Sequence, residues 1–189
     1  AYMEKAKQET NRQVQQAYFE QSLRSLLRAR ELNPLNTDHT ANMARLYRTW
    51  GEKEPDAQLR QERLHTALRG YEEATELSPH NAQLFNEWGL VYFMLGDLPS
   101  AQAKYNQSLA LDEEFVQTYL LIGDIYWTQK DWPNVISTYE KAVALSPKFV
   151  QGWSALGYAY SQIDELEQAI DANSHVLEYI LQQCDARRL

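Results

Sequence analysis

The side chains from which a metal site or a nucleophile would first be sought are four histidines, His39, His65, His80 and His175, and one cysteine, Cys184. A zinc site on a helix needs ligands one turn apart, at i and i+4, and no two of these histidines have that spacing. Cys184 lacks the sequence signature of a catalytic nucleophile, and a lone cysteine forms no internal disulfide. We therefore expect no metal site, no thiol chemistry and no cofactor.

Paired carboxylates, which general acid–base catalysis would use, occur as Glu72-Glu73 and Glu113-Glu114. Adjacent residues on a helix point about 100° apart, so we interpret both pairs as exposed charge. The glycines occur singly, and no phosphate-cradling loop is present. The sequence predicts no enzyme, although the chain can still be the non-catalytic region of a larger one.

The charge balance disfavours a nucleic-acid partner. The formal net charge is -8, whereas affinity for phosphates rests on clustered Lys and Arg. The one basic cluster is interleaved with carboxylates, which favours a solvated helix surface over an anion site. The cluster comprises Arg24, Arg28, Arg30, Arg45 and Arg48, and the carboxylates are Glu20, Glu31 and Asp38. No run of about eighteen apolar residues occurs, so we expect no membrane insertion by this segment.

A period of 34 residues runs through the second half of the sequence. The segment endings Leu77-Ser78-Pro79 and Leu145-Ser146-Pro147 lie 68 residues apart, which is two periods, and Leu111-Asp112-Glu113 stands midway. The first halves of three successive segments align as Phe85, Trp88, Gly89 and Tyr92; Tyr119, Ile122, Gly123 and Tyr126; and Trp153, Leu156, Gly157 and Tyr160. The second halves align as Ala101, Tyr105 and Ser108; Val135, Tyr139 and Ala142; and Ala169, Asn173 and Val176, of which only Asn173 is out of character.

These positions reproduce the pattern W-x2-L-G-x2-Y, then A-x3-F, then P, so the sequence resembles the tetratricopeptide repeat family over residues 82 to about 183. The resemblance implies an all-α fold, a right-handed superhelical α-solenoid of antiparallel helix pairs with about nine helices. It also implies a non-catalytic scaffold that binds a peptide or protein partner in a concave groove lined by the first helices.

The repeated residue types have a physical role. Large residues at i, i+3 and i+7 form the buried stripe of each first helix, and Gly89 and its counterparts leave space where the second helix crosses. Asp97 and Asp131 are placed to cap the second helices, each two residues before a proline that suits an early helical position. Pro79 and Pro147 end the helices that precede them.

The N-terminal half keeps the pattern only in part. Asn33-Pro34 lies 45 residues before Pro79, eleven more than one period, and we place the insertion near 51–57, where helical periodicity lapses. No turn signal interrupts residues 4–32, which predicts one long helix. We expect a single domain made of a long N-terminal helix (1–34), a diverged repeat (35–81), three repeats (82–115, 116–149 and 150–183) and a C-terminal extension (184–189). The last helix, which begins near Glu165, is expected to run on into the extension as a cap or to lead to a further helix.

Residues offset from the packing stripe would face the groove of the family. By this carry-over the three regular repeats present Gln83, Asn86, Leu90 and Phe93; Gln117, Leu120, Asp124 and Trp127; and Gln151, Ser154, Tyr158 and Ser161, and the diverged repeat adds Asp38, Asn42, Arg45 and Arg48. Phe93, Trp127 and Tyr158 are candidate aromatic anchors, with packing against neighbouring helices as the alternative interpretation. A subclass of the family grips C-terminal carboxylates with Lys, Arg and Asn, but here those positions hold residues such as Asn86, Leu120, Asp124 and Ser154. Binding of a chaperone tail is therefore disfavoured.

A second function stays open beside the scaffold. Residues 33–47 resemble segments of the soluble repeat domains of bacterial O-antigen ligase or polymerase-type membrane proteins. This resemblance implies an accessory domain of a membrane protein that ligates or polymerises cell-surface polysaccharide. A glycan would then be a possible partner, but no other feature of the sequence supports it. The start Ala1-Tyr2-Met3 leads straight into a helical pattern, which suggests a domain cut from a longer chain. The expected location is cytoplasmic for a stand-alone protein and extracytoplasmic for a domain of a membrane protein.

Overall fold

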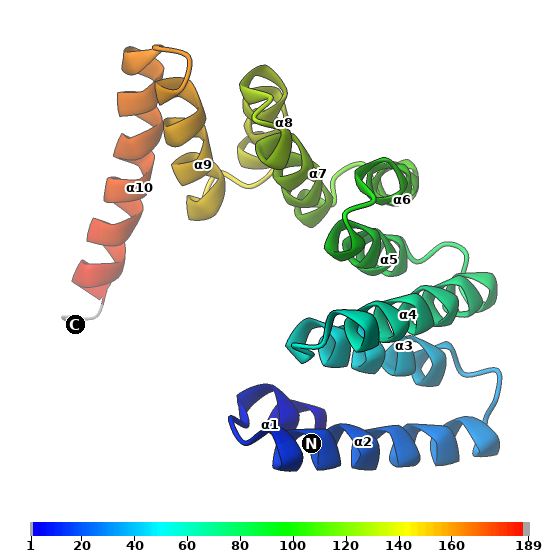
Figure 1. The fold of residues 1–189 in the computed structure, drawn as a ribbon. Helices are drawn as coiled ribbons and strands as arrows, with labels where there is room; N and C mark the ends of the chain where they lie inside the picture. Colours follow the sequence, from blue (N-terminus) through cyan, green and yellow to red (C-terminus); the bar gives the residue numbers. More distant parts are fainter. Residues whose placement is uncertain (1, 187–189) are drawn as a thin grey trace. The chain divides into compact units, whose positions relative to one another are not determined.

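The computed structural model describes residues 2–186, and this part of the chain forms ten helices and no strand. The helices are α1 (Tyr2–Gln8), α2 (Arg12–Leu32), α3 (Thr37–Lys53), α4 (Ala57–Leu77), α5 (Ala82–Leu95), α6 (Leu98–Leu111), α7 (Val116–Gln129), α8 (Trp132–Leu145), α9 (Val150–Ser161) and α10 (Leu166–Ala186). The predicted all-α fold is confirmed, and Figure 1 shows antiparallel pairs such as α3 with α4 and α9 with α10. Within residues 2–186, none of the helices combines the length and the apolar character that a membrane span requires.

Contacts between the helices divide the chain into two compact units. The first unit, Ala1–Leu111, holds α1 to α6, and the second, Asp112–Leu189, holds α7 to α10. Each has its own apolar core: Tyr71, Trp88 and Val91 lie at the centre of the first unit, and Tyr139 and Leu156 at the centre of the second.

The single helix predicted over residues 4–32 is wrong, because Glu9, Thr10 and Asn11 separate α1 from α2. The Asn11 side chain caps α2 by accepting the N–H groups of Gln13 at 3.0 Å and Val14 at 3.2 Å. The Glu9 carboxylate accepts the N–H groups of Thr10 and Asn11 at 2.9 and 2.8 Å. The backbone groups freed by the break thus find partners, as a stable helix start requires. This break makes ten helices where about nine were expected.

The insertion in the diverged repeat lengthens two helices and does not form a long loop. α3 has 17 residues and α4 has 21, whereas α5 and α6 have 14 each. Only residues 54–56 separate α3 from α4, so the lapse that was predicted near 51–57 is confined to these three positions. The additional turns extend the contact between the two helices, which is visible in Figure 1.

The repeated glycines lie where paired helices approach most closely, as the sequence predicted. A Cβ atom built on Gly89 would lie 2.4 Å from Cε1 of Tyr105 and 3.0 Å from the carbonyl oxygen of Ala101. Gly123 meets Tyr139 in the same way, at 2.7 Å. The tyrosines that fill these spaces are buried, so each first helix packs directly on an aromatic ring of its partner.

Replacing Gly89 with alanine is expected to lower the free energy of unfolding by about 2 kcal/mol. Overpacking costs about 1–3 kcal/mol, and this outweighs the gain of up to about 1 kcal/mol that alanine normally brings to a helix. Urea denaturation of Gly89→Ala, Tyr105→Leu and the double variant measures the coupling. Relief of the penalty in the double variant is the expected result, and simple additivity would contradict the close contact.

The predicted caps and helix ends are also found. The Asp97 carboxylate accepts the N–H of Ser100 at 3.1 Å, and the Asp131 carboxylate accepts the N–H of Asn134 at 3.4 Å. α4 and α8 end two residues before Pro79 and Pro147. At the C-terminal end α10 runs through residues 166–186, which confirms that the last helix continues past the third repeat.

Candidate partner-binding site

Polar groups on the first helices of the N-terminal unit form one hydrogen-bonded network. Arg45 on α3 donates from Nε to Glu87 on α5 at 2.7 Å and from Nη1 to the Asn42 side chain at 3.0 Å. Gln83 donates to the other carboxylate oxygen of Glu87 at 2.9 Å. Arg45 and Glu87 are mostly buried, which strengthens their attraction relative to an ion pair in solvent. Three predicted groove residues, Asn42, Arg45 and Gln83, are thus brought together around Glu87.

The hydroxyl of Tyr71, on the second helix α4, lies beside this network. Burial raises the pKa of Tyr71 well above its ordinary value, the Glu87 carboxylate adds to this, and Arg48 and Arg45 oppose it. Arg48 Nε is buried and has no hydrogen-bond partner within the described residues. Leaving a buried donor unsatisfied is costly, and because this nitrogen is buried it does not itself offer a hydrogen bond to solvent.

The other groove residues predicted on α5 are less accessible than expected. Asn86 is 4% exposed, so its side chain lies inside the unit and does not face solvent. Leu90 and Phe93 are half-buried, and Gln83 remains exposed. Phe93 therefore exposes only part of its ring.

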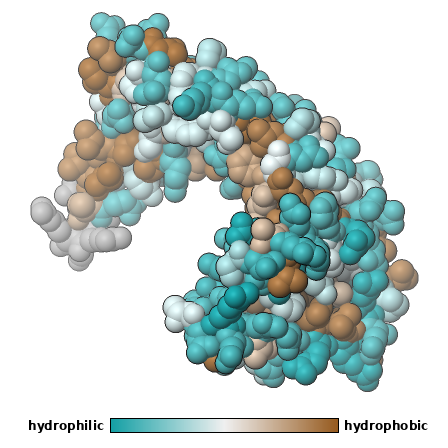
Figure 2. Space-filling model, in the orientation of Figure 1, coloured by the Kyte–Doolittle hydropathy of each residue, from teal (hydrophilic) through white to brown (hydrophobic). Residues whose placement is uncertain are grey.

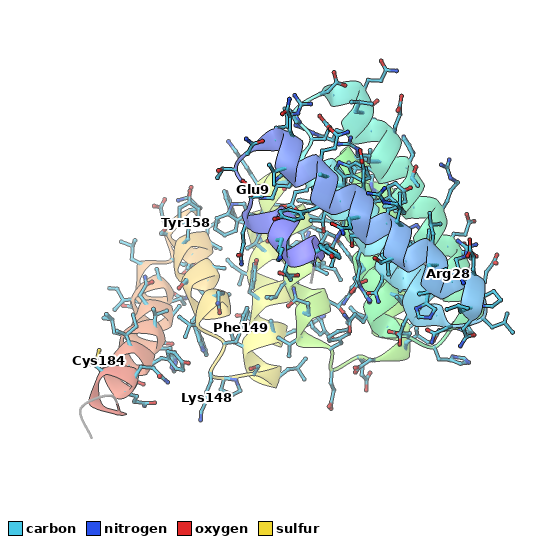
Figure 3. The ribbon with its side chains drawn as sticks, turned by 90° about the horizontal axis from the view of Figure 1, so that it is seen from below. Glu9, Arg28, Lys148, Phe149, Tyr158 and Cys184 are labelled. Atoms are coloured by element: carbon cyan, nitrogen blue, oxygen red, sulfur yellow. The ribbon has the colours of Figure 1, made fainter. Side chains whose placement is uncertain are left out.

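The C-terminal unit presents a cluster of three aromatic rings, which we call the aromatic cluster: Trp127 on α7, Trp132 on α8 and Tyr158 on α9. The ring centroid of Tyr158 lies 4.9 Å from that of Trp127 and 5.8 Å from that of Trp132, and the two tryptophans meet edge to face at 5.4 Å. Tyr158 is 49% exposed, and both tryptophans are half-buried against the core. Figure 3 shows Tyr158 near one end of α9, with Phe149 at the other end. The core therefore holds the two tryptophan rings in place, and the cluster is open to solvent on the side of Tyr158.

Asp124 lies one turn before Trp127 on α7, with part of its side chain open to solvent and part of its carboxyl covered. Partial burial raises the pKa of its carboxyl, and the Tyr139 hydroxyl opposes this by donating a hydrogen bond to Oδ1 at 3.3 Å. Burial of the Tyr139 hydroxyl, together with the nearby Asp124 carboxylate, raises the pKa of Tyr139. A carboxylate with this partner is held in position close to the aromatic cluster.

The remaining predicted residues of the C-terminal unit are divided between surface and core. Gln117, Gln151, Ser154 and Ser161 are exposed, whereas Leu120 packs against the core cluster. Neither Glu87 nor Trp132 was among the predicted groove residues. Glu87 follows Gln83 by four residues, the spacing of a helical side-chain pair, and this spacing was a usable signal. Trp132 was interpreted only as part of a helix start.

A hollow of about 420 Å³ in the C-terminal unit lies between α8, α9 and α10. Trp153, Leu156 and Ala172 line it, and Tyr160 donates a hydrogen bond to Glu140 at 2.6 Å on its rim. Burial raises the pKa of Tyr160 to about 12, with Glu140 contributing.

Within residues 2–186, no group of three or more His, Cys, Asp or Glu side chains is arranged to hold a metal ion.

Comparison with known proteins agrees with this architecture. Sequence models described as TPR repeat or tetratricopeptide repeat match residues 89–130, 116–149 and 138–171. The structure of MamA is similar with a TM-score of 0.74 and 18% identity, over 90% of this chain and 93% of that one. A thermophilic TPR protein of Thermus thermophilus has a TM-score of 0.68 and 21% identity, over 78% and 75% of the two chains.

A peptide-bound structure is also similar. The first TPR of Spaghetti, solved with the HSP90 peptide SRMEEVD, has a TM-score of 0.51 and 18% identity, over 66% of this chain and 95% of that one. No curated protein sequence matches the chain. The period of 34 residues, the glycine–tyrosine contacts and the three matched repeat segments agree, and residues 89–171 of the chain belong to the tetratricopeptide repeat family.

Proposed function

We propose that the chain is a non-catalytic scaffold that binds a peptide or protein partner through the first-helix faces of its repeats, with the aromatic cluster as the main anchor. The carrying observation is that Tyr158, half exposed, lies within 6 Å of two tryptophan rings that the core holds in place. Rigid aromatic groups with one open side are typical of residues that dominate binding energy. The tetratricopeptide fold, which carries a bound peptide in the Spaghetti structure, is consistent with such a role.

The chemistry of the cluster favours one kind of ligand segment. Trp127 and Trp132 offer ring faces and edges to an apolar or aromatic side chain, and the nearby Asp124 carboxylate favours a cation beside it. The net charge of -8 acts in the same direction. An acidic C-terminal tail has the opposite character, and the residues that would clamp it are replaced, with Asn86 buried and Asp124 negative. We infer a partner segment that combines an apolar anchor with Lys or Arg.

Binding of a selected peptide tests this proposal. Peptides are selected from a displayed random library on the wild-type chain, and their dissociation constants are measured by fluorescence anisotropy. Trp127→Ala and Tyr158→Ala are each expected to weaken binding at least about ten-fold, because loss of an anchor costs about 1.4 kcal/mol or more. Leu145→Ala, which removes a side chain of similar exposure (40%) from the end of α8, is the matched control and should bind as the wild type does. Unchanged binding by both aromatic variants would refute the assignment.

The alternative function, an accessory domain of a bacterial membrane protein of O-antigen ligation or polymerisation, stays a prediction that rests on residues 33–47. These residues form the connection before α3 and most of that helix, and Asn42 and Arg45 belong to the network of the N-terminal unit. The complete gene decides between the two: about ten hydrophobic spans upstream would support the accessory domain, and a short frame without them would reject it.

A further inference from the structure

One face of α10 carries an apolar stripe that is open to solvent. Leu166, Ile170, Leu177 and Leu181 are 61%, 68%, 61% and 64% exposed. Their spacing of four, seven and four residues places them on one side of the helix. Figure 2 shows hydrophobic side chains gathered on the surface over α10. So many large apolar side chains in one row point to an interaction surface.

The repeat register shows what this face is built to contact. The residues 34 positions before Ile170 and Leu177 are Ile136 and Val143 of α8, which are only 9% and 5% exposed. Both lie in the core cluster against which the next first helix, α9, packs Trp153 and Tyr160. The stripe of α10 thus occupies positions that receive the following first helix elsewhere in the same unit.

The N-terminal unit shows the same arrangement independently. The corresponding residues of α4 are Leu68 and Thr75; Thr75 is 7% exposed, and Leu68 packs on the cluster that includes Trp88 and Val91 of α5. In both units, therefore, the first helix of the next repeat packs over this position of the preceding second helix. Within residues 2–186, no helix packs over the stripe of α10, although its residues occupy the positions that such a helix covers on α4 and α8.

The charges beside the stripe restrict the covering helix. Glu167, Asp171 and Glu178 are exposed on one flank, and the sequence of α10 contains no Lys or Arg. A helix with basic residues along one edge would pair with this carboxylate row. A second copy of α10 contains no Lys or Arg, so neither a parallel nor an antiparallel pairing of two stripes supplies basic residues to this row, and the antiparallel pairing also sets the two rows on the same side, where like charges repel. This disfavours a second copy of the chain as the occupant.

We infer that the apolar stripe of α10 docks an amphipathic helix of another polypeptide, with large apolar residues at i, i+3 and i+7 and basic residues along one edge. Four turns are sufficient, since the stripe spans roughly 22 Å at about 1.5 Å per residue. The apolar pattern is that of α9, where Trp153, Leu156 and Tyr160 have this spacing. The surface is separate from the aromatic cluster, because α10 contributes no residue to that cluster.

The probe is a synthetic helix with the sequence of residues 149–162, held helical by a side-chain cross-link, in which Gln151, Ser154, Ser161 and Gln162 are replaced by lysine. A matched peptide carries glutamate at the same four positions. Binding to the full chain is measured by fluorescence anisotropy. We expect saturable binding of the lysine peptide and at least ten-fold weaker binding of the glutamate peptide. Absence of saturable binding, or equal binding of both, would overturn the proposal.

Variants of the chain locate the binding. The double variant Ile170→Ser, Leu177→Ser should weaken binding of the lysine peptide at least ten-fold, whereas the control Val14→Ser, Leu27→Ser, which changes exposed apolar residues of α2, should not. Glu167→Lys, Glu178→Lys should reverse the preference toward the glutamate peptide, and this result does not depend on the apolar variant folding normally. Equal binding by both double serine variants, or a concentration-dependent dimer in sedimentation velocity that Ile170→Ser, Leu177→Ser abolishes, would contradict docking of a foreign helix.

Discussion

Replacing Glu54 with glutamine is expected to lower the free energy of unfolding by about 3 kcal/mol. Glu54 is 6% exposed at the end of α3, and its carboxylate pairs with Arg63 of α4 and with Arg12 of α2, the latter at 2.7 Å. The variant would leave Arg63, which is 14% exposed, without its counterion. The effect lies at the lower end of the cost of breaking a buried pair, because Arg12 is mostly in solvent.

Urea denaturation followed by circular dichroism measures this loss. Glu73→Gln is the matched control, because it breaks an Arg–Glu pair of equal length, 2.7 Å to Arg30, in which both side chains are more than one third exposed. Its effect should stay below about 1 kcal/mol. Equal effects of the two variants would contradict the assignment of Glu54 as the buried link between α2, α3 and α4.

The contribution of Glu54 should also depend on pH. Burial alone would raise the pKa of its carboxyl, but the Asp56 N–H, Arg63 and Arg12 together hold it below its ordinary value. The folded state then binds a proton less readily than the unfolded state, so this stability is complete above the unfolded pKa of about 4.3. It is lost as the pH falls through the folded pKa, and the difference from Glu54→Gln should shrink over that range.

Replacing Tyr71 with alanine is expected to lower the free energy of unfolding by about 3–5 kcal/mol. Tyr71 is 0% exposed, and its ring packs among Ala44, Leu64 and Trp88. Alanine would leave a cavity that helices α3, α4 and α5 share, which the surrounding side chains fill only in part. Tyr71→Phe keeps the ring and should cost about 1 kcal/mol or less. Thermal and urea denaturation compare the two variants. If Tyr71→Phe lowers the free energy of unfolding as much as Tyr71→Ala does, the hydroxyl and not the buried ring stabilises this unit, which would contradict the prediction.

The repeat architecture was predictable because each contact recurs at a fixed interval and involves neighbouring helices. Gly89 meets Tyr105 and Gly123 meets Tyr139 at aligned positions, and Asn173, whose residue type is out of character, also lies 2.7 Å from the position of a Cβ on Gly157. Position in the repeat therefore determined the contact even where the residue type changed. The capping aspartates and the prolines beyond helix ends were predictable for the same local reasons.

The irregular parts were harder to predict because their signals were weak or non-local. Thr10-Asn11 ends one helix and caps the next without a glycine or proline, and most of the eleven extra residues of the diverged repeat lengthen α3 and α4 on either side of a short break. Whether a residue beside the buried stripe of a helix is itself buried depends on how the neighbouring helix packs, and the periodicity of one helix gives no information about this. Asn86 is buried and Trp132 joins the aromatic cluster for this reason.

The most direct test of the binding account is a map of amide and indole chemical shifts in the isotope-labelled chain, titrated with a peptide selected from the random library. The account predicts the largest chemical-shift changes at the Trp127 and Trp132 indoles and at the amides around Tyr158. In Tyr158→Ala, these shifts should change less at each peptide concentration. Changes confined to helices that contribute no residue to the aromatic cluster would contradict it.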